Sequence, residues 1–146
     1  MIRTLFFALA GGLGAAAIAA AQAAAPTPGG SLASDSGAFE LRTYTAAPGK
    51  LEALHARFRN HTNRLFAKHG MKIIGFWVPI DKDKGADNTL VYLLRYPDRA
   101  ARDKSWEDFR KDPEWIAVRD ASEASGKVVD KVDSVMLTAT DYSPLK

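Results

Sequence analysis

The sequence predicts an α+β fold whose strands and helices follow the order β-α-β-β-α-β. Apolar and polar side chains alternate from Phe39 to Tyr44, as in a half-buried strand. Apolar side chains then recur at helical spacings after Lys50, and a second helical segment follows Asp98. Between them, two β-rich segments are joined by a short polar turn, which predicts an antiparallel hairpin. This order is that of ferredoxin-like folds, with a four-stranded antiparallel sheet and helices on one face.

The first strand is followed by one long helix. Pro48-Gly49 ends the strand, and the helix from Lys50 has an apolar stripe made of Leu51, Leu54, Phe58 and Leu65. We expect Gly70 to end this helix in a left-handed conformation, which glycine adopts without steric cost. The basic side chains of the helix are expected to form a solvated face, made of Arg57, Arg59, Arg64 and Lys68.

The hairpin strands are expected at Met71 to Ile80 and Thr89 to Tyr96, joined by a turn from Asp81 to Asn88. Both sides of the first of these strands are apolar, because Ile74, Phe76 and Val78 are expected to lie opposite Ile73, Gly75 and Trp77. One helical layer covers only one sheet face. We therefore expect the other face to pack against a second subunit, in a homodimer or a larger even-numbered oligomer.

The second helical region divides at Asp112-Pro113-Glu114. Asp98 is a suitable N-cap for a helix toward Lys111, and Asp112 can cap a shorter helix from Pro113 to about Ser122. A single continuous kinked helix is the alternative. A last strand is expected from Val128 to Thr140.

Residues 1–25 are typical of a secretory signal peptide. Arg3 supplies the positive charge, an uncharged run follows, and Ala21-x-Ala23 is a cleavage pattern. An uncleaved membrane anchor is the alternative. Residues 26–37 are expected to form a disordered leader, and residues 38–146 one folded domain. We expect an exported protein, periplasmic or secreted, that is soluble and free of the membrane after cleavage.

Composition and missing motifs exclude several functions. The chain has no cysteine, which excludes disulfides, thiol nucleophiles and thiolate metal sites. Its 20 Lys plus Arg and 17 Asp plus Glu are interspersed, so no nucleic-acid partner is expected. A glycine-rich phosphate loop, G-x-S-x-G and H-E-x-x-H are absent. The spacing of His55, His61 and His69 does not let two of them share an ion on one helix, so no metal site is expected.

From Phe39 to Leu137 the chain resembles the NIPSNAP family, a branch of the dimeric α/β-barrel superfamily. The resemblance rests on short linked motifs: Glu40-Leu-Arg-Thr-Tyr44, Pro48-Gly49-Lys50, Lys68-His69-Gly70, Gly75-Phe76-Trp77, the Tyr92 strand and Trp106-x-x-Phe109-x-x-Asp112-Pro113-Glu114-Trp115. It implies a dimeric α/β barrel with a pocket between each sheet and its own helices. The superfamily includes cofactor-free monooxygenases, isomerases, haem-handling enzymes and members without an established reaction, so it does not imply one chemistry.

His69 is the candidate catalytic residue. At about 100° per residue it lies in line with Leu51 and near Leu65, on the apolar side of the helix. There it is either a general acid or base, or a haem ligand, facing the pocket, or a cap for the helix C-terminus.

The candidate substrate-binding residues are Arg42, Tyr44, Trp77 and Tyr92. Arg42 can bind an anionic or carbonyl group, or it can pair with Glu40 or with a carboxylate at the subunit interface. The aromatic side chains line a pocket or pack the core.

Three classes of function remain from the sequence. The first is a protein that binds a small apolar or aromatic molecule without a cofactor, with or without proton-transfer or monooxygenase chemistry. The second is a non-enzymatic oligomeric scaffold with a closed pocket. The third is a haem protein using His69.

Overall fold

A computed structural model of the protein describes residues 37–146. The expectations about a signal peptide and about the leader up to residue 36 lie outside this range. The strands are β1 (Ala38–Ala46), β2 (Lys72–Trp77), β3 (Thr89–Tyr96) and β4 (Val129–Thr138). The helices are α1 (Leu51–Arg57), the π-helical η1 (Phe58–Thr62), α2 (Asn63–Lys68), the short 3-10 turn η2 (Lys82–Lys84), α3 (Arg99–Lys111) and α4 (Pro113–Ser122).

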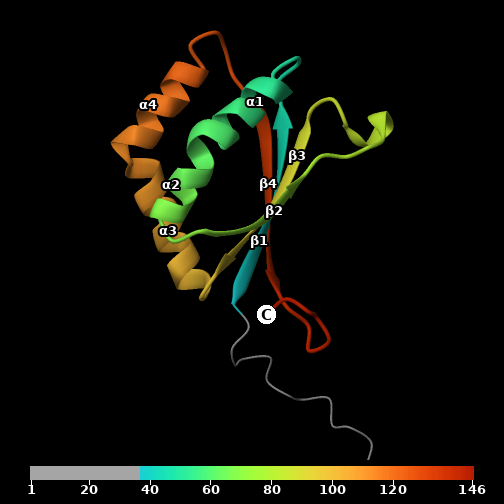
Figure 1. Ribbon diagram of the computed structural model, residues 1–146, viewed down its shortest axis with the longest axis vertical. Coiled ribbons are helices and arrows are strands. Elements are labelled where there is room, and N and C mark those ends of the chain that lie inside the picture. The colour runs from blue at the N-terminus through green and yellow to red at the C-terminus, as the bar shows by residue number, and fades with distance from the viewer. Residues whose placement is uncertain (1–36) are drawn as a thin grey trace, which may run out of the picture. The chain divides into compact units, whose positions relative to one another are not determined.

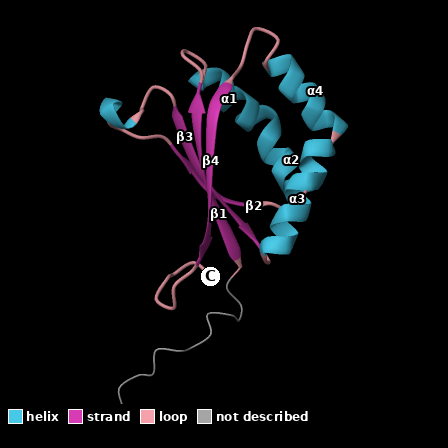
Figure 2. Ribbon diagram, turned by 180° about the vertical axis from the view of Figure 1, so that it is seen from behind, coloured by secondary structure: helices cyan, strands magenta, loops and turns pink. Residues whose placement is uncertain are grey.

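The strands form one sheet in the order β2-β3-β1-β4, and each neighbouring pair is antiparallel. Helices α1 to α4 lie on one face of this sheet, as the two opposite views show (Figures 1 and 2). The predicted fold class is therefore confirmed: the domain has the ferredoxin-like subunit fold of dimeric α/β-barrel proteins. Among the described residues, no helix is both long and apolar enough to cross a membrane.

The core lies between the sheet and the helices. On β3 every second side chain is buried toward the helices, namely Leu90, Tyr92, Leu94 and Tyr96. The expected helical stripe meets them, because Leu54, Phe58 and Leu65 are buried in the same cluster. Phe58 contacts the Tyr92 ring edge-on at a centroid distance of 5.3 Å.

The long first helix contains a π-helical turn that its sequence pattern does not predict. In η1 the hydroxyl of the buried Thr62 donates to the Arg57 carbonyl oxygen at 3.2 Å, which helps to satisfy a backbone acceptor in the widened turn. The expectation of a solvated basic face is wrong for Arg57, whose side chain is 5% exposed. Arg59 and Arg64 are exposed as expected.

A bulge in β2 changes which side chains share a face. The pairing with β3 shifts between Ile73 and Gly75, so Ile73 and Phe76 both pack toward the core. The predicted strict alternation, which put Ile73 with Gly75 and Trp77, is therefore wrong at Ile73.

The helix boundaries follow the predicted capping residues. Gly70 has a positive φ of 74° after α2. Asp98 accepts the Ala101 N–H at 2.7 Å at the start of α3. Asp112 has an extended backbone and accepts the Glu114 N–H at 2.9 Å, so α3 and α4 are two separate helices and not one kinked helix.

Candidate functional site

Glu40 on β1 is a fully buried carboxylate on the side of the sheet that faces the helices. It accepts hydrogen bonds from Arg42 at 2.7 Å, Ser134 at 2.6 Å, Trp106 at 2.6 Å and Tyr96 at 3.0 Å, and from Arg102. Its donors come from four elements, β1, β3, β4 and α3. We call these six residues the Glu40 cluster.

The electrostatics keep this carboxylate charged. Burial by itself would raise the pKa of Glu40, but hydrogen bonds from Arg102, Ser134, Trp106 and Arg42 lower it to about 2. Burial, followed by the charge of Glu40, raises the pKa of Tyr96 above its usual range. The Tyr96 hydroxyl therefore stays protonated and remains a hydrogen-bond donor.

Arg42 extends the Glu40 cluster toward the aromatic core. Its Nε donates to the Tyr92 hydroxyl at 2.9 Å, and an Nη contacts the Tyr44 hydroxyl at 3.4 Å. The guanidinium carbon lies 4.1 Å from the centre of the Trp106 ring. The structure thus brings together Arg42, Tyr44 and Tyr92, three of the four predicted substrate-binding residues.

This part of the sheet is open at the edge strand β4. Ser134 is opposite Arg42 in the β1–β4 register, and Val132 is opposite Tyr44, so both belong to the helix-facing side. Val132 is nevertheless 42% exposed and Ser134 is also exposed, whereas Tyr92 on the inner strand β3 is completely buried. The described helices therefore leave the helix-facing side of β4 accessible next to Arg42.

Trp77 is separated from the other predicted site residues. It pairs with Val91 on the sheet face away from the helices and is 52% exposed. Its indole lies over Gly75, where an added Cβ would be 2.7 Å from Cη2 of the ring. Trp77 and Tyr92 therefore lie on opposite faces of the sheet and do not line one cavity.

His69 lies at the end of α2, where its Nε2 is 2.7 Å from Oδ2 of the buried Asp112. Lys68 donates to the same oxygen at 2.6 Å. Hydrogen bonds from Lys68 and then from His69 lower the pKa of Asp112. The path from His69 toward Arg42 runs through the rings of Phe109 and Trp106, so the imidazole is not placed against the guanidinium. Within residues 37–146, no group of three or more His, Cys, Asp or Glu side chains has a metal-binding arrangement.

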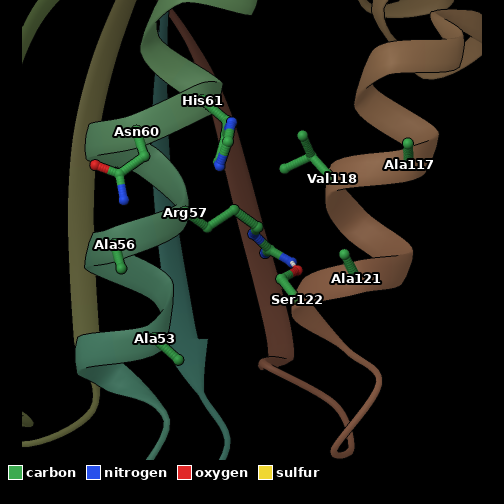
Figure 3. Close-up of a pocket in the computed structure, with 9 residues that line it drawn as sticks. All are labelled: Ala53, Ala56, Arg57, Asn60, His61, Ala117, Val118, Ala121 and Ser122. Atoms are coloured by element: carbon green, nitrogen blue, oxygen red, sulfur yellow. Dashed lines mark hydrogen bonds between the residues drawn. The ribbon is translucent and has the colours of Figure 1, made fainter.

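A separate groove of about 550 Å³ lies between α1–η1 and α4. Figure 3 shows side chains from both helices around it. Its apolar walls consist mainly of small residues, Ala53, Ala56, Ala117, Val118 and Ala121. Small side chains leave space between the two helices, and this space is the groove.

The polar lining of this groove includes Arg57, Asn60, His61 and Ser122. Arg57 reaches from α1 toward α4, where an Nη donates to Ser122 Oγ at 3.2 Å (Figure 3). The same Nη of Arg57 donates to Oε1 of Glu123, just after α4, at 3.1 Å. Its Nε is buried and has no hydrogen-bond partner. A buried donor without a partner is uncommon and costs free energy.

The sequence anticipated part of these sites. Pairing of Arg42 with Glu40 was one of its two expected roles, because side chains two apart share a strand face. Arg102 was not anticipated, since it meets Glu40 across 62 positions of sequence. Arg57 was missed because its residue type suggested a solvated position.

Comparison with known proteins places the chain in a family. A family model described as NIPSNAP matches residues 39–144. No curated protein is significantly similar to the chain.

The similar solved structures have the same fold. A NIPSNAP family protein from Agrobacterium tumefaciens has a TM-score of 0.65 and 21% identity, over 75% of this chain and 99% of its own. A NIPSNAP-like domain protein from Burkholderia xenovorans has a TM-score of 0.64 and 18% identity, over 74% and 89%. A second A. tumefaciens NIPSNAP family protein, described as having unknown function, has a TM-score of 0.64 and 16% identity, over 75% and 94%. With the family model matched across nearly the whole described domain, this chain belongs to the NIPSNAP family.

Proposed function

We propose that the protein binds a small aromatic or apolar molecule that carries a carboxylate or carbonyl group, between the sheet and the helices, with Arg42 orienting that group. The observation that carries this proposal is the position of Arg42. Its guanidinium lies on the Trp106 ring, beside the accessible side of β4. The guanidinium can bind the polar end of a ligand, and the aromatic ring can contact the apolar body of the same ligand.

The hydrogen-bonding capacity of Arg42 supports a ligand at this point. A guanidinium has five N–H donors, and the contacts of Arg42 with Glu40, Tyr92 and Tyr44 use three of them. Glu40 also divides its charge between Arg42 and Arg102. The second carboxylate that contacts Arg102 belongs to the exposed Asp103, where solvent screens it. The Arg42 guanidinium can therefore still attract a hydrogen-bond acceptor on a ligand.

The test is a calorimetric titration with benzoate, which combines an aromatic ring with a carboxylate. We expect saturable binding that weakens at least about tenfold in Arg42→Gln, because a charge-assisted hydrogen bond is lost. Arg59→Gln, at an arginine that is 65% exposed, is the matched control and should bind as the parent protein does. Equal affinities for the two variants would refute the role of Arg42. Arg42→Lys, which keeps the charge, serves if Arg42→Gln does not fold.

Proton transfer by His69 is a second candidate. It is favoured by the His69–Asp112 contact, because a carboxylate that holds an imidazole is the usual partner of a histidine base. The same contact joins the end of α2 to the start of α4, which is a structural role. His69→Gln distinguishes them: loss of turnover or binding at an unchanged melting temperature supports the site, and a lower melting temperature with unchanged binding supports the structural role. A Soret band on haem titration that is lost in this variant would instead favour the haem alternative.

We also propose that the protein forms a homodimer, or a larger even-numbered assembly, through the sheet face away from the helices. This face carries exposed apolar side chains, including Trp77, Val135 at 53% and Leu137 at 42% exposure. Exposed large apolar side chains on one sheet face are typical of interfaces. If the protein has no ligand, this assembly supports the scaffold alternative.

Export is proposed from the Arg3 region and Ala21-x-Ala23. Intact-mass analysis of the exported protein should give a chain that starts near Gln22 to Pro26. Retention of Met1 would refute cleavage.

A further inference from the structure

The groove between α1–η1 and α4 has the properties of a second ligand site, independent of the proposed function at Arg42. Its volume of about 550 Å³ lies within the range of small-molecule pockets. Its apolar walls are mostly alanine, so a flat or narrow apolar body can approach both helices closely. We infer that this groove binds a small, mainly apolar molecule with a neutral carbonyl oxygen, and that Arg57 is the donor to that oxygen.

Arg57 supplies the observation that points to a ligand. Its side chain is 5% exposed, and it reaches across the groove toward α4 (Figure 3). Its Nε donor has no acceptor, which leaves a desolvated polar group without compensation. The Nε atoms of Arg95 and Arg102 also have no acceptor, and of these three arginines Arg57 is the one that lines this groove. A ligand oxygen that accepts from Nε removes this cost. Because Nε is enclosed, this binding requires the guanidinium to turn toward the groove, at the expense of the 3.2 Å contact between Nη and Ser122 Oγ.

The charges around Arg57 favour a neutral acceptor over an anion. Glu123 is 3.1 Å from the Arg57 Nη and already compensates the guanidinium charge. A ligand carboxylate at Nε would lie close to this glutamate and be repelled by it. A ketone, ester or amide oxygen accepts the one free N–H without that repulsion.

The π-helical turn brings two further polar groups to the same groove. Asn60 and His61 both belong to η1, and both line the groove beside Arg57 (Figure 3). Single π-helical turns inside α-helices occur frequently at functional sites, because they rotate side chains out of the regular helical order. Here the turn contributes an amide and an imidazole to the polar lining of an otherwise apolar groove.

Three probes of similar size test the chemistry of the ligand: acetophenone has a carbonyl, benzoate a carboxylate and ethylbenzene neither. Each is titrated into the ¹⁵N-labelled protein, and the backbone and arginine Nε–H signals are followed by NMR. Acetophenone should shift the signals of residues 53–61 and 117–122 and the Nε–H signal of Arg57 in a saturable way. Ethylbenzene should bind the groove about tenfold more weakly, because it has no acceptor for the charged donor. Benzoate should also bind this groove more weakly than acetophenone does.

Two variants and a control separate the groove from the rest of the protein. Ala117→Trp fills the groove from the exposed surface of α4 and should abolish the acetophenone shifts. Ala67→Trp places the same side chain at an exposed alanine of α2 that does not line the groove, and it should leave the acetophenone shifts unchanged. Arg57→Met should weaken acetophenone binding about tenfold but should not change the binding of ethylbenzene.

Four results would overturn the inference. The first is the absence of saturable groove shifts with acetophenone. The second is unchanged acetophenone binding in Ala117→Trp, and the third is tighter groove binding of benzoate than of acetophenone. The fourth is acetophenone shifts centred on Arg42 and Trp106 in place of Arg57, which would assign the ligand to the other site. Since benzoate binding at Arg42 is measured separately, a negative result at one site does not affect the proposal for the other.

Discussion

Replacing Glu40 by glutamine removes a buried charge while it keeps the size of the side chain. Arg42 and Arg102 then lose the carboxylate they share, and one carboxylate oxygen becomes an amide group that cannot accept. Removing one partner of a buried ion pair costs about 3 to 5 kcal/mol. We expect Glu40→Gln to lower the free energy of unfolding by this amount at neutral pH.

The pH dependence gives a second and more specific expectation. The pKa of Glu40 is lowered to about 2 in the folded protein, from an ordinary value of 4.5. A carboxylate with a lowered pKa stabilises the fold fully above its unfolded pKa, and this contribution is lost as the pH falls through the folded pKa. The difference between the two pKa values corresponds to about 3 kcal/mol. Because glutamine does not titrate, the destabilisation caused by Glu40→Gln should shrink by about that amount as the pH falls from about 6 to about 2.

Urea unfolding of both proteins at several pH values measures this difference. Other groups titrate in the same way in both proteins, so their contributions largely cancel. Glu52→Gln is the control, since Glu52 is 78% exposed and its contact with Arg59 is 3.4 Å long. It should change the free energy of unfolding by less than about 0.5 kcal/mol. A Glu40→Gln effect that is independent of pH, or below about 1 kcal/mol near neutral pH, would refute the importance we give to the Glu40 cluster.

Three further predictions test the core, the interface and a helix boundary. Phe58→Ala should lower the free energy of unfolding by about 3 to 5 kcal/mol, because the side chain is 5% exposed and leaves a cavity; a loss below about 1 kcal/mol in urea unfolding would contradict its place in the core. Val135→Lys puts a charge on the sheet face away from the helices and should turn the proposed oligomer into a monomer in sedimentation at micromolar concentration, whereas an oligomer of unchanged size in this variant would place the interface elsewhere. Asp98→Ala removes the N-cap of α3 and should cost about 1 kcal/mol, and an unchanged unfolding midpoint would show that the cap is dispensable.

The regular elements were predictable because their side-chain periodicity reflects burial. On β3 alternate side chains are buried from Leu90 to Tyr96, as expected for a strand with one face on the core. The capping positions of Asp98, Asp112 and Gly70 were predictable for local reasons. Each aspartate accepts a hydrogen bond from a backbone N–H at the start of its helix, and Gly70 adopts the positive φ that ends α2.

The departures from regular geometry were not predictable in this way. The β2 bulge exchanges the face of Ile73, and a strand with apolar residues on both sides has no pattern that reveals such an exchange. In the π-helical turn the Thr62 hydroxyl donates to the Arg57 carbonyl oxygen. Threonine at this position is compatible with an ordinary helix, so its sequence does not indicate the wider turn.

The candidate sites show the same limit at the level of single residues. The Glu40–Arg42 pair is local to one strand and could be anticipated. Ser134 and Arg102 reach Glu40 across 94 and 62 positions, and only the completed sheet and α3 bring them together. A buried carboxylate with donors on four elements is therefore a property of the topology.

Arg57 is different, because a local signal was present and its residue type concealed it. At about 100° per residue, Arg57 lies only about 60° from Leu54 around the helix, at the border of the apolar stripe. Lys and Arg are seldom buried unless they are paired, which favoured a solvated position. In the structure Ser122 at the end of α4 and Glu123 just after it provide that pairing, while Nε stays without a partner. Here an arginine three positions from a core leucine makes a buried polar contact, and that contact lies beside the groove.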